Sequence, residues 1–498
     1  MSHETLLIRA DADVAIGTGH VMRCLALAQA WQDAGGNTVF AMAGSTPATA
    51  ARLKEEGIEI VHLAAPAGAA EDAQQTVLLA GRKNANCIVV DGYQFGSAFQ
   101  RAIKTAGFKL LFLDDYGHAE HYCADLVLNQ NLLASRDLYS NRDSSTQLLL
   151  GPRYAMLRRE FCPWREWRRE IPPSGRRILV TMGGSDPDNL TAKVIKGLRN
   201  LSGNPEIVVL VGGSNPHRRS LETLAQNESM RLVIDSGRMP ELMAWADVAV
   251  AGAGTTVWEM CFMGLPAILL VLAENQRGTA AAAEEKGFAC SLGNGAAASV
   301  STLAEKLRQL LDSSKTRTSQ SERGRSLIDG RGANRVLAFL SDLQLRRALE
   351  SDCEVFWEWA SDPEARAASF RNKTISWEQH SKWFRTKMED PNAILYTATN
   401  AGGLPMGEVR YQIEGNRAVL SISLGARFRG CGLGQKVLAV AIERFFQESE
   451  VEFIDAFVKL TNQPSLKLFA SAGFRRLPLR LIEEQEAVHF VLERNALA

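Results

Sequence analysis

The chain has 498 residues, of which 46% are hydrophobic and 22% charged, and its 56 basic residues are balanced by 56 acidic ones. This composition is typical of a globular protein, and the length suggests about three domains. Because the net charge is zero, no overall field would gather phosphate backbones or acidic lipids. We therefore expect small-molecule partners rather than nucleic acid or a membrane.

The eight cysteines are scattered along the chain without any Cys-x-x-Cys pair, which argues against a disulfide framework and against a zinc cluster. Arg9, Asp11 and Asp13 interrupt the N-terminal segment before an apolar stretch of signal-peptide length develops, and the strongest apolar run, 266–273, is too short to cross a bilayer. We therefore expect a cytoplasmic protein, and the sequence indicates no obligate protein partner.

Short apolar runs alternate with helical patterns through the first two thirds of the chain, as in parallel sheets covered by helices on both faces. The runs fall into two sets: 6–10, 38–43, 87–93 and 109–115, and then 177–184, 206–213, 247–254 and 266–273. A charged, proline-containing segment at 163–177 separates them. This pattern predicts an α/β fold with two Rossmann-like domains, residues 1–168 and 169–342, whose strand ends face one ligand cleft.

The last third of the chain, residues 343–498, follows a different pattern. Aromatic residues gather first, between Phe356 and Phe384, and strand-like runs follow at 394–401, 406–413 and 418–425. The third run leads into a glycine-rich turn and a helix. This order predicts a separate α+β domain.

The first predicted strand leads through Gly17 and Gly19 to His20 at the start of a helix. The glycines allow a tight turn that brings the backbone close to a ligand. A helix N-terminus disfavours the imidazolium form, so a neutral His20 would be able to accept a proton from water. A histidine that only caps the turn is the alternative.

The second domain contains a similar loop, in which Gly252 and Gly254 precede Thr255 and Thr256 after an apolar strand. The amides after Gly254 and the two hydroxyls are suited to holding a diphosphate. Glu259, one turn further on, is suited to accepting hydrogen bonds from ribose hydroxyls. A glycine loop alone is weak evidence, and its value lies in the pairing with the first loop.

Segments 9–28, 89–93, 182–187, 251–276 and 327–336 together resemble the nucleotide-sugar hydrolases of pseudaminic acid biosynthesis, which are similar to GT-B glycosyltransferases. The resemblance implies that UDP-2,4-diacetamido-2,4,6-trideoxy-β-L-altropyranose is hydrolysed to UDP and free sugar without a metal, by water that His20 deprotonates. It places Tyr93 and Asn275 against the sugar or the leaving diphosphate, although Tyr93 is equally compatible with a core position. The implied UDP-sugar contacts are Gly17, Gly19, Arg23, Gly254, Thr255, Thr256, Glu259 and Gln276.

The glycine-rich turn of the third domain spans 429–434, between a strand-like run and a helix, where several backbone amides can converge on an anion. With the strand-like run at 454–462 and the segment that follows it, this part resembles the Gcn5-related N-acetyltransferase family. The resemblance implies acetyl-CoA as co-substrate, with its pyrophosphate on the turn. The implied acetyl-CoA contacts are Leu424, Ala426, Arg429, Gly430, Gly432, Gly434, Asn462 and Ser465.

The front of this domain, with Trp359, Asp362, Arg366, His380 and Trp383, is similar to acetyltransferases that act on 4-amino nucleotide sugars. That similarity implies acetylation of N4 of UDP-4-amino-4,6-dideoxy-N-acetyl-β-L-altrosamine. Aromatic residues and histidine at such positions are also compatible with a core.

Phe469 stands where many members of the family have a tyrosine that protonates the departing thiolate, and phenylalanine has no proton to donate. Either water or another hydroxyl such as Ser465 replaces it, or the domain is slow or inactive. Glu408 and Ser423 are both candidates for the general base.

The two resemblances concern successive steps of one pathway, so the preferred hypothesis is a bifunctional enzyme that acetylates and then hydrolyses. One alternative is a GT-B glycosyltransferase with a UDP-sugar donor, although the sequence shows no apolar or basic patch suited to an acceptor. The other alternative is a hydrolase whose third domain senses acyl-CoA or a sugar without catalysis, which Phe469 would favour.

Overall fold

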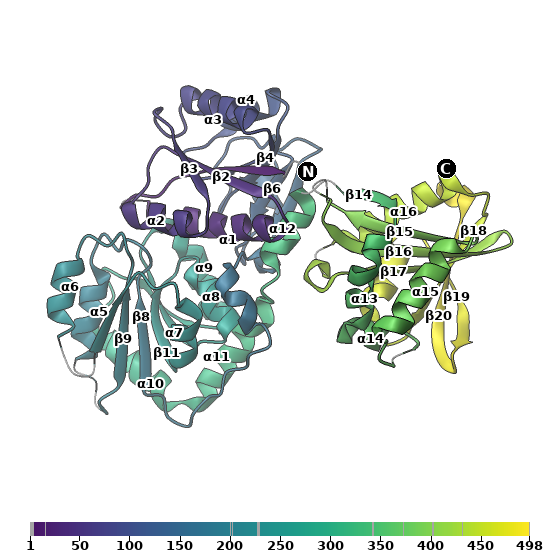
Figure 1. Cartoon of the computed structure of the whole chain (residues 1–498). Helices are drawn as coiled ribbons and strands as arrows, with labels where there is room; N and C mark the ends of the chain where they lie inside the picture. Colours follow the sequence, from purple (N-terminus) through teal and green to yellow (C-terminus); the bar gives the residue numbers. More distant parts are fainter. Residues whose placement is uncertain are drawn as a thin grey trace. The chain divides into compact units, whose positions relative to one another are not determined.

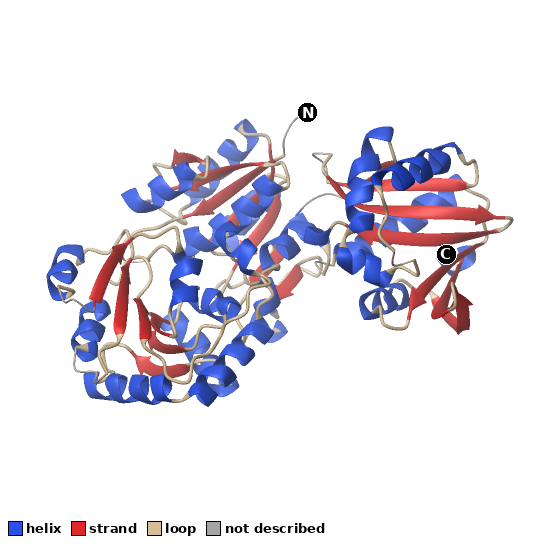
Figure 2. Ribbon diagram, turned by 60° about the horizontal axis from the view of Figure 1, so that its bottom comes forward, coloured by secondary structure: helices blue, strands red, loops and turns tan. Residues whose placement is uncertain are grey.

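The structure is a computed structural model that describes residues 4–14, 16–199, 201, 203–226, 230–340, 343–371, 373–400, 403–430 and 432–497. The described residues form two compact units that part between Val336 and Leu337. The first unit holds two parallel sheets and the second a mixed sheet, which confirms the predicted fold class (Figures 1 and 2). Within the described ranges, no helix is both long enough and apolar enough to span a bilayer.

The first sheet has seven parallel strands in the order β3-β2-β1-β4-β5-β6-β7. Figure 1 shows α3 and α4 on one face and α1 and α2 on the other. The strand order reverses between β1 and β4, so the loops that follow these strands diverge and open a crevice at the carboxyl edge. The elements are β1 (Thr5–Ala10), α1 (Gly19–Asp33), β2 (Asn37–Met42), α2 (Pro47–Glu55), β3 (Glu59–His62), α3 (Ala70–Arg82), β4 (Ala85–Asp91), α4 (Ser97–Thr105), β5 (Lys109–Leu113), β6 (Leu126–Asn129) and β7 (Gln147–Leu150).

The second sheet has six parallel strands in the order β10-β9-β8-β11-β12-β13, with the same reversal between β8 and β11. Helices lie on both of its faces (Figure 2). Its elements are β8 (Arg177–Thr181), α5 (Leu190–Leu198), β9 (Glu206–Val211), α6 (Arg218–Leu224), β10 (Met230–Ile234), α7 (Met239–Trp245), β11 (Val248–Gly252), α8 (Thr256–Met263), β12 (Ala267–Val271), α9 (Arg277–Lys286), β13 (Cys290–Asn294), α10 (Val300–Asp312), α11 (Ser314–Leu327) and α12 (Gly332–Leu340).

The central strands are apolar along their whole length because both of their faces are covered. Every residue of β1 is buried, and so is every residue of β12. The buried Arg9 of β1 is neutralised by Asp11, at 2.7 Å, and by Asp72, at 2.9 Å. Asp11 also accepts the amides of Ala43 and Gly44, so one ion network fixes the segment that leads from β1 toward α1.

The second unit contains a seven-stranded sheet in the order β14-β15-β16-β17-β18-β20-β19. All neighbouring pairs are antiparallel except β17 with β18. Its elements are β14 (Gln344–Arg347), α13 (Cys353–Ser361), α14 (Pro363–Ala368), α15 (Trp377–Glu389), β15 (Ala393–Thr399), β16 (Pro405–Glu414), β17 (Arg417–Leu424), α16 (Leu433–Glu448), β18 (Phe453–Lys459), α17 (Gln463–Ser471), β19 (Arg475–Ile482) and β20 (Gln485–Glu493).

The strands β17 and β18 separate partway along their length. Their parallel pairing runs from Arg417 opposite Phe453 to Val419 opposite Asp455, yet β17 continues to Leu424 and β18 to Lys459. The last residues of β17 therefore turn one edge of their backbone toward an open wedge in the sheet, and unpaired backbone groups at such an edge can bind an extended ligand.

Candidate active sites

His20 lies in the crevice of the first sheet, as the second residue of α1. Its Nδ1 is 2.6 Å from Oδ1 of Asp91, the last residue of β4. Because a carboxylate can only accept, Nδ1 carries a proton, and in the neutral form of the ring Nε2 keeps its lone pair. The side chain of His20 is 10% exposed, so this nitrogen belongs to a nearly dry site.

Arg23, one turn further along α1, joins Asp91 to a second carboxylate. It donates Nε and Nη2 to the two oxygens of Asp91, both at 2.6 Å, and Nη1 to Asp115, at 2.7 Å. Burial alone would raise the pKa of Asp91, but the charge of Arg23 and the hydrogen bonds from Arg23 and His20 hold that pKa well below its usual range. The expectation that Arg23 contacts the UDP-sugar is not supported by this geometry, because its guanidinium is buried between two carboxylates.

Tyr93 and Asn275 meet across the cleft. The Tyr93 hydroxyl donates to Oδ2 of Asp115, at 2.6 Å, and accepts from Nδ2 of Asn275, at 2.7 Å. Tyr93 also lies edge-on to His20, with the ring centroids 4.9 Å apart. Burial and then the charge of Asp115 raise the pKa of Tyr93, so the phenol keeps its proton. The structure thus brings together three predicted residues, His20, Tyr93 and Asn275, from segments that are far apart in the chain.

The glycine loops of the two sheets face each other closely. A Cβ at Gly184 would lie 2.0 Å from Oγ1 of Thr18, so only glycine fits there. Gly17 has a φ of 77°, in the left-handed region, and Gly19 lies opposite Thr255. These contacts leave backbone, rather than bulky side chains, at the mouth of the cleft.

The remaining predicted UDP-sugar contacts lie around the start of α8. Thr255 is the N-cap of α8 and Thr256 is its first residue, and the backbone amides at such a helix N-terminus are suited to binding an anion. Gln276 packs beneath Gly254 and accepts the amide of Leu272, at 3.0 Å. Glu259 already accepts Nη2 of Arg158, at 2.8 Å, through its Oε1.

Two residues that the sequence analysis did not single out, Asp91 and Asp115, carry the charge network. Asp91 is the last residue of β4 and Asp115 lies two residues after β5, in the runs 87–93 and 109–115, and this position at the end of an apolar run was the available signal. Their partnership depends on β1, β4 and β5 being neighbours in the sheet, which the sequence pattern alone does not specify. In the described ranges, no group of three histidine, cysteine or acidic side chains is arranged as metal ligands.

The wedge between β17 and β18 forms the second candidate site. Leu424 ends β17 and Ala426 follows it, so both border the wedge as the predicted pantetheine contacts would. The glycine turn follows, with φ of 69° at Gly430 and 81° at Gly432, and α16 begins at Leu433. These left-handed positions let the chain turn sharply into the helix N-terminus, which is suited to a pyrophosphate. Cys431, within the same turn, lies outside the described residues.

Other predicted acetyl-CoA contacts have partners within the protein. Arg429 donates Nε to the carbonyl of Leu424, at 2.8 Å, and Nη1 pairs with Asp362, so it braces the turn. The side chain of Asn462 caps α17 by accepting the amide of Ser465, at 3.2 Å. Gly434 lies in the first turn of α16, against Leu468.

Phe469 is a core residue of this unit, only 4% exposed. Its ring stacks on Phe490, at 5.7 Å between centroids, and meets Phe474 edge-on at 5.1 Å. The ring cannot supply a proton to a thiolate.

A cavity of about 660 Å³ lies beside the wedge, on the sheet face that α13 and α15 partly cover. Glu408 and Arg410 enter it from β16, and His380 from α15. Several buried polar atoms on its walls have no hydrogen-bond partner within the described part of the chain: Glu408 Oε2, Arg410 Nε, His380 Nε2 and Arg366 Nε. Arg410 Nε and Glu408 Oε2 face each other as an ion pair at 3.7 Å, beyond hydrogen-bond distance. Buried polar groups are rarely left unsatisfied, so this grouping makes the cavity a candidate site for a polar ligand.

The charges around this cavity are predominantly positive. Four cations and two carboxylates line it: Arg366, Arg371, Lys373, Arg410, Glu408 and Glu483. Burial raises the pKa of Glu408, the residue predicted as a possible base. Burial, together with the charge of Arg410, lowers the pKa of His380.

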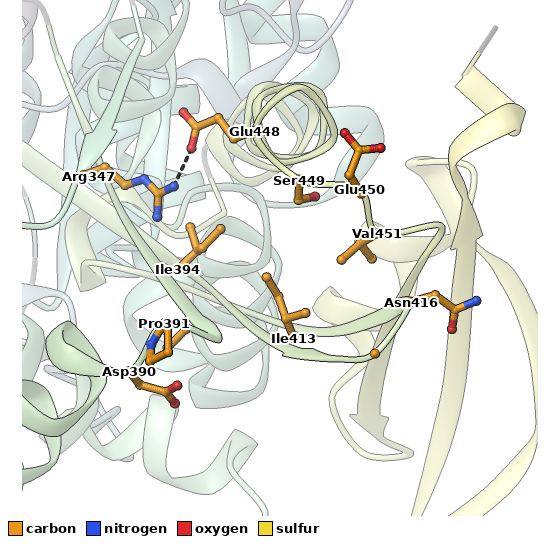
Figure 3. A pocket seen from close by; sticks show the side chains of 12 residues that line it. Arg347, Asp390, Pro391, Ile394, Ile413, Asn416, Glu448, Ser449, Glu450 and Val451 are labelled. Atoms are coloured by element: carbon orange, nitrogen blue, oxygen red, sulfur yellow. Dashed lines mark hydrogen bonds and ion pairs between the residues drawn. The ribbon is translucent and has the colours of Figure 1, made fainter.

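A larger hollow, of about 770 Å³, lies at the other end of the same sheet (Figure 3). It is bordered by Ile413 and Asn416, at the end of the β16–β17 hairpin opposite to Leu424, and by the C-terminal end of α16. Figure 3 shows the ion pair of Arg347 and Glu448 closing one side of it, at 2.7 Å. The predicted acetyl-CoA contacts are all at the opposite end.

Two family models match the chain. The glycosyltransferase family 28 C-terminal domain covers residues 177–330, and the acetyltransferase (GNAT) domain covers residues 342–475. The chain therefore joins a domain of the family 28 glycosyltransferase type, as found in nucleotide-sugar enzymes, to a GNAT acetyltransferase domain.

Three relatives match over different parts. An uncharacterized protein of Methanocaldococcus jannaschii is 22% identical over 95% of this chain and 96% of its own length. The spore coat polysaccharide biosynthesis protein SpsG of Bacillus subtilis is 30% identical over 40% of this chain and 59% of its own. The UDP-2,4-diacetamido-2,4,6-trideoxy-β-L-altropyranose hydrolase of Campylobacter jejuni is 25% identical over 57% of this chain and 97% of its own.

Solved structures match each unit. MurG of Acinetobacter baumannii is 16% identical, covers 68% of this chain and 99% of its own, and has a TM-score of 0.48. An aminoglycoside acetyltransferase in complex with coenzyme A is 19% identical, covers 31% of this chain and 97% of its own, and has a TM-score of 0.29.

Proposed function

We propose that the chain is a bifunctional enzyme of pseudaminic acid biosynthesis. The domain of residues 343–498 acetylates N4 of UDP-4-amino-4,6-dideoxy-N-acetyl-β-L-altrosamine with acetyl-CoA. The domains of residues 1–168 and 169–342 then hydrolyse the resulting UDP-2,4-diacetamido-2,4,6-trideoxy-β-L-altropyranose to UDP and free sugar. The observation that carries the proposal is the pairing of His20 with Asp91 at the mouth of a glycine-lined cleft, and the similarity to the Campylobacter jejuni hydrolase supports it.

In the hydrolytic step, Nε2 of His20 takes a proton from water while the water oxygen attacks the anomeric carbon and the bond to the UDP oxygen breaks, with inversion. The charges of the site favour this transfer. Two carboxylates, Asp91 and Asp115, share one guanidinium, that of Arg23, which leaves one negative charge in excess. That charge is balanced when His20 becomes an imidazolium, and Asp91 holds the ring in the orientation that the transfer needs.

The leaving diphosphate gains negative charge as the glycosidic bond breaks. The amides at the start of α8, after Gly254, and the hydroxyls of Thr255 and Thr256 are the donors suited to hold it. Removing one such donor typically raises a barrier by ~3 kcal/mol. Gln276 supports this loop from below, through its contact with Gly254.

In the acetyl-transfer step, acetyl-CoA supplies the thioester. The amine nitrogen attacks the carbonyl carbon, the bond to sulfur breaks, and the amine proton passes to a base. Glu408 is our preferred base over Ser423, because its buried carboxylate lines the cavity and its raised pKa suits proton transfer near neutral pH. Because Phe469 has no proton to donate, a water molecule or Ser465 protonates the thiolate instead.

The excess of cations around the cavity favours an acceptor that carries phosphate over one that is only an amine. Arg366, Arg371, Lys373 and Arg410 are the residues suited to a nucleotide diphosphate. These cations favour a nucleotide sugar as the acceptor, and a nucleotide-sugar product is what the hydrolytic site would use next.

The proposal is tested by incubating the full chain with the 4-amino sugar nucleotide and acetyl-CoA and following all products by mass spectrometry. We expect the acetylated sugar nucleotide first, and then UDP with the free diacetamido sugar. The His20→Asn variant should accumulate the acetylated sugar nucleotide and still bind UDP. Release of more than a few per cent of the normal UDP by this variant would exclude His20 as the base.

Two other outcomes would favour the alternatives. A glycosyltransferase would release little UDP from a UDP-sugar until an acceptor is added. A sensor domain would bind acetyl-CoA without acetylating the amine. Phe469, a buried residue without a proton to donate, is the reason to test for it.

A further inference from the structure

A continuous series of hydrogen bonds connects the second parallel sheet with the predicted base. It begins on the 3₁₀ turn Glu274–Gln276, which follows β12, and ends on α1. Its members, in order, are Asn275, Tyr93, Asp115, Arg23, Asp91 and His20. All of the links between them measure 2.6 or 2.7 Å.

Only the first link crosses between the two parallel sheets. Asp91 is fully buried, and the side chains of Arg23 and Asp115 are 5% and 7% exposed, so these groups are enclosed within the first half. Asn275, by contrast, lies on an exposed turn of the second half. The link between Asn275 and Tyr93 therefore exists only when the two halves are brought together.

The hydrogen bond from Asn275 fixes the direction in which the Tyr93 hydroxyl points its own hydrogen. The Tyr93 hydroxyl has one hydrogen, and when Asn275 donates to its oxygen that hydrogen is directed to Asp115. Asp115 is then satisfied by Tyr93 on Oδ2 and by Arg23 and Asn131 on Oδ1. If the hydroxyl turned away, Asp115 would compete more strongly with Asp91 for the guanidinium of Arg23, because both carboxylates depend on it.

We propose that Asn275 and Tyr93 are positioning residues that make the tautomer and orientation of His20 depend on closure of the two halves. In the closed arrangement Asp91 accepts the Nδ1 proton of His20 and leaves Nε2 ready to act on water. In an open arrangement the series loses its first donor, and Asp91 and His20 are held less firmly. The inference rests on the proposed hydrolysis, and it adds a positioning role to the expected contact of these two residues with the sugar or the leaving diphosphate.

The experiment compares the full chain with its Asn275→Ala and Tyr93→Phe variants and with the double variant, all saturated with UDP. Selective ¹⁵N labelling of histidine reports the protonation of both ring nitrogens, and His20→Asn assigns the signal. We expect the unmodified chain to show the Nδ1-protonated form, and each variant to show a mixture. The matched control is Glu274→Gln, on the same turn, whose carboxylate pairs only with Arg277 among the described residues and is 82% exposed.

Turnover gives a second readout. Each single variant should lower kcat by about 10²-fold, as a misplaced catalytic group does, while KM for the sugar nucleotide stays nearly constant. The double variant should be no slower than Tyr93→Phe, since both act through one series. Two results would overturn the inference. One is a double variant whose loss of kcat equals the product of the two single losses. The other is a rise in KM with no change in the His20 signal. If the unmodified chain releases no UDP, the proposed function fails, yet the ¹⁵N measurement still decides whether Asn275 controls His20.

Discussion

Asp91 accepts hydrogen bonds from three neighbouring side chains, those of His20, Arg23 and Cys24. Each of these donors comes from the first two turns of α1, so a single carboxylate at the end of β4 fixes the start of the helix that carries the predicted base. The Asp91 side chain is fully buried, so its oxygens are shielded from bulk solvent. The orientation of His20 therefore depends on this residue more than on any other.

Replacing Asp91 by asparagine tests this dependence. The Asp91→Asn amide can donate to Nδ1, which would move the proton to Nε2 and remove the base. We expect kcat for UDP release to fall by about 10³–10⁴-fold, with UDP binding kept, because the equivalent change in other histidine–aspartate pairs has an effect of this size. Steady-state kinetics and calorimetric UDP titration measure the two quantities.

The control for this change is Asp143→Asn. Asp143 also pairs with a histidine, His121, at 2.9 Å, but both residues are on the surface of the same unit. This variant should keep its full rate. Equal losses in both variants would mean that Asp91 acts through general stability rather than through His20.

Asp114 shows how buried charge makes stability depend on pH. Burial alone would raise its pKa, but hydrogen bonds from His118, Tyr122 and the amide of Gly117 lower that pKa to about 2. A carboxyl group with a depressed pKa in the folded state stabilises the protein above its unfolded pKa of about 3.9, and this contribution is lost as pH falls toward the folded value. The shift corresponds to about 2 kcal/mol.

We therefore expect Asp114→Asn to lower the free energy of unfolding at neutral pH by about 2 kcal/mol. The difference from the unmodified chain should shrink as pH falls from about 4 to about 2. Urea titrations followed by tryptophan fluorescence at several pH values measure it. A difference that stays constant down to the lowest pH would show that another group is responsible.

At the scale of elements, the central strands could be predicted and the edge strands could not. Strands β1, β8, β11 and β12 are buried on both faces, so they read as continuous apolar runs. Strands β3, β14 and β19 lie at sheet edges, where mixed polar residues such as Glu59 and Arg475 give no clear pattern.

The candidate site follows the same division. His20 and the glycine loops could be found because they lie where a central strand is connected to the next helix. The pairings of Asp91 with His20 and of Arg158 with Glu259 join residues 71 and 101 positions apart, and only the folded strand order brings them together. The sequence indicates that Phe469 lacks the hydroxyl of the tyrosine found in many acetyltransferases of this type, but its burial in the core is known only from the structure.

The turn before α16 provides a prediction at this scale. Gly432 has a φ of 81°, and an alanine there would cost roughly 1–2 kcal/mol of backbone strain and reshape the turn around an anion. We expect Gly432→Ala to weaken acetyl-CoA binding by about 10-fold, the equivalent of 1.4 kcal/mol, as measured by calorimetry. Gly415, with a φ of 63° at the opposite end of the sheet, provides a matched control. Gly415→Ala should lose similar stability and keep its affinity, and equal weakening in both would refute a local role.

At the scale of the whole molecule, two units with separate candidate sites share one chain, and a relative in Methanocaldococcus jannaschii matches this chain over 95% of its length. Fusion guarantees that the two units, and with them the two proposed activities, are made in equal amounts. It does not by itself require that the acetylated sugar nucleotide pass directly between the sites, since a product released to solvent can be captured again by diffusion.

Two full-length variants can decide between release and direct transfer. His20→Asn should lack the hydrolytic base but keep acetyl transfer, and Glu408→Gln should lack the preferred acetylation base but keep hydrolysis. If the intermediate is released, a mixture of the two should make UDP and the free diacetamido sugar after a short lag, at a rate that rises with the concentration of either variant. Mass spectrometry of timed samples should show the acetylated sugar nucleotide accumulating during the lag.

Each variant alone should stop at one step, and Glu408→Gln should hydrolyse added diacetamido substrate at the normal rate. A mixture that acetylates and hydrolyses in separate assays, but fails to carry the 4-amino substrate through both steps, would contradict release and require transfer within one chain.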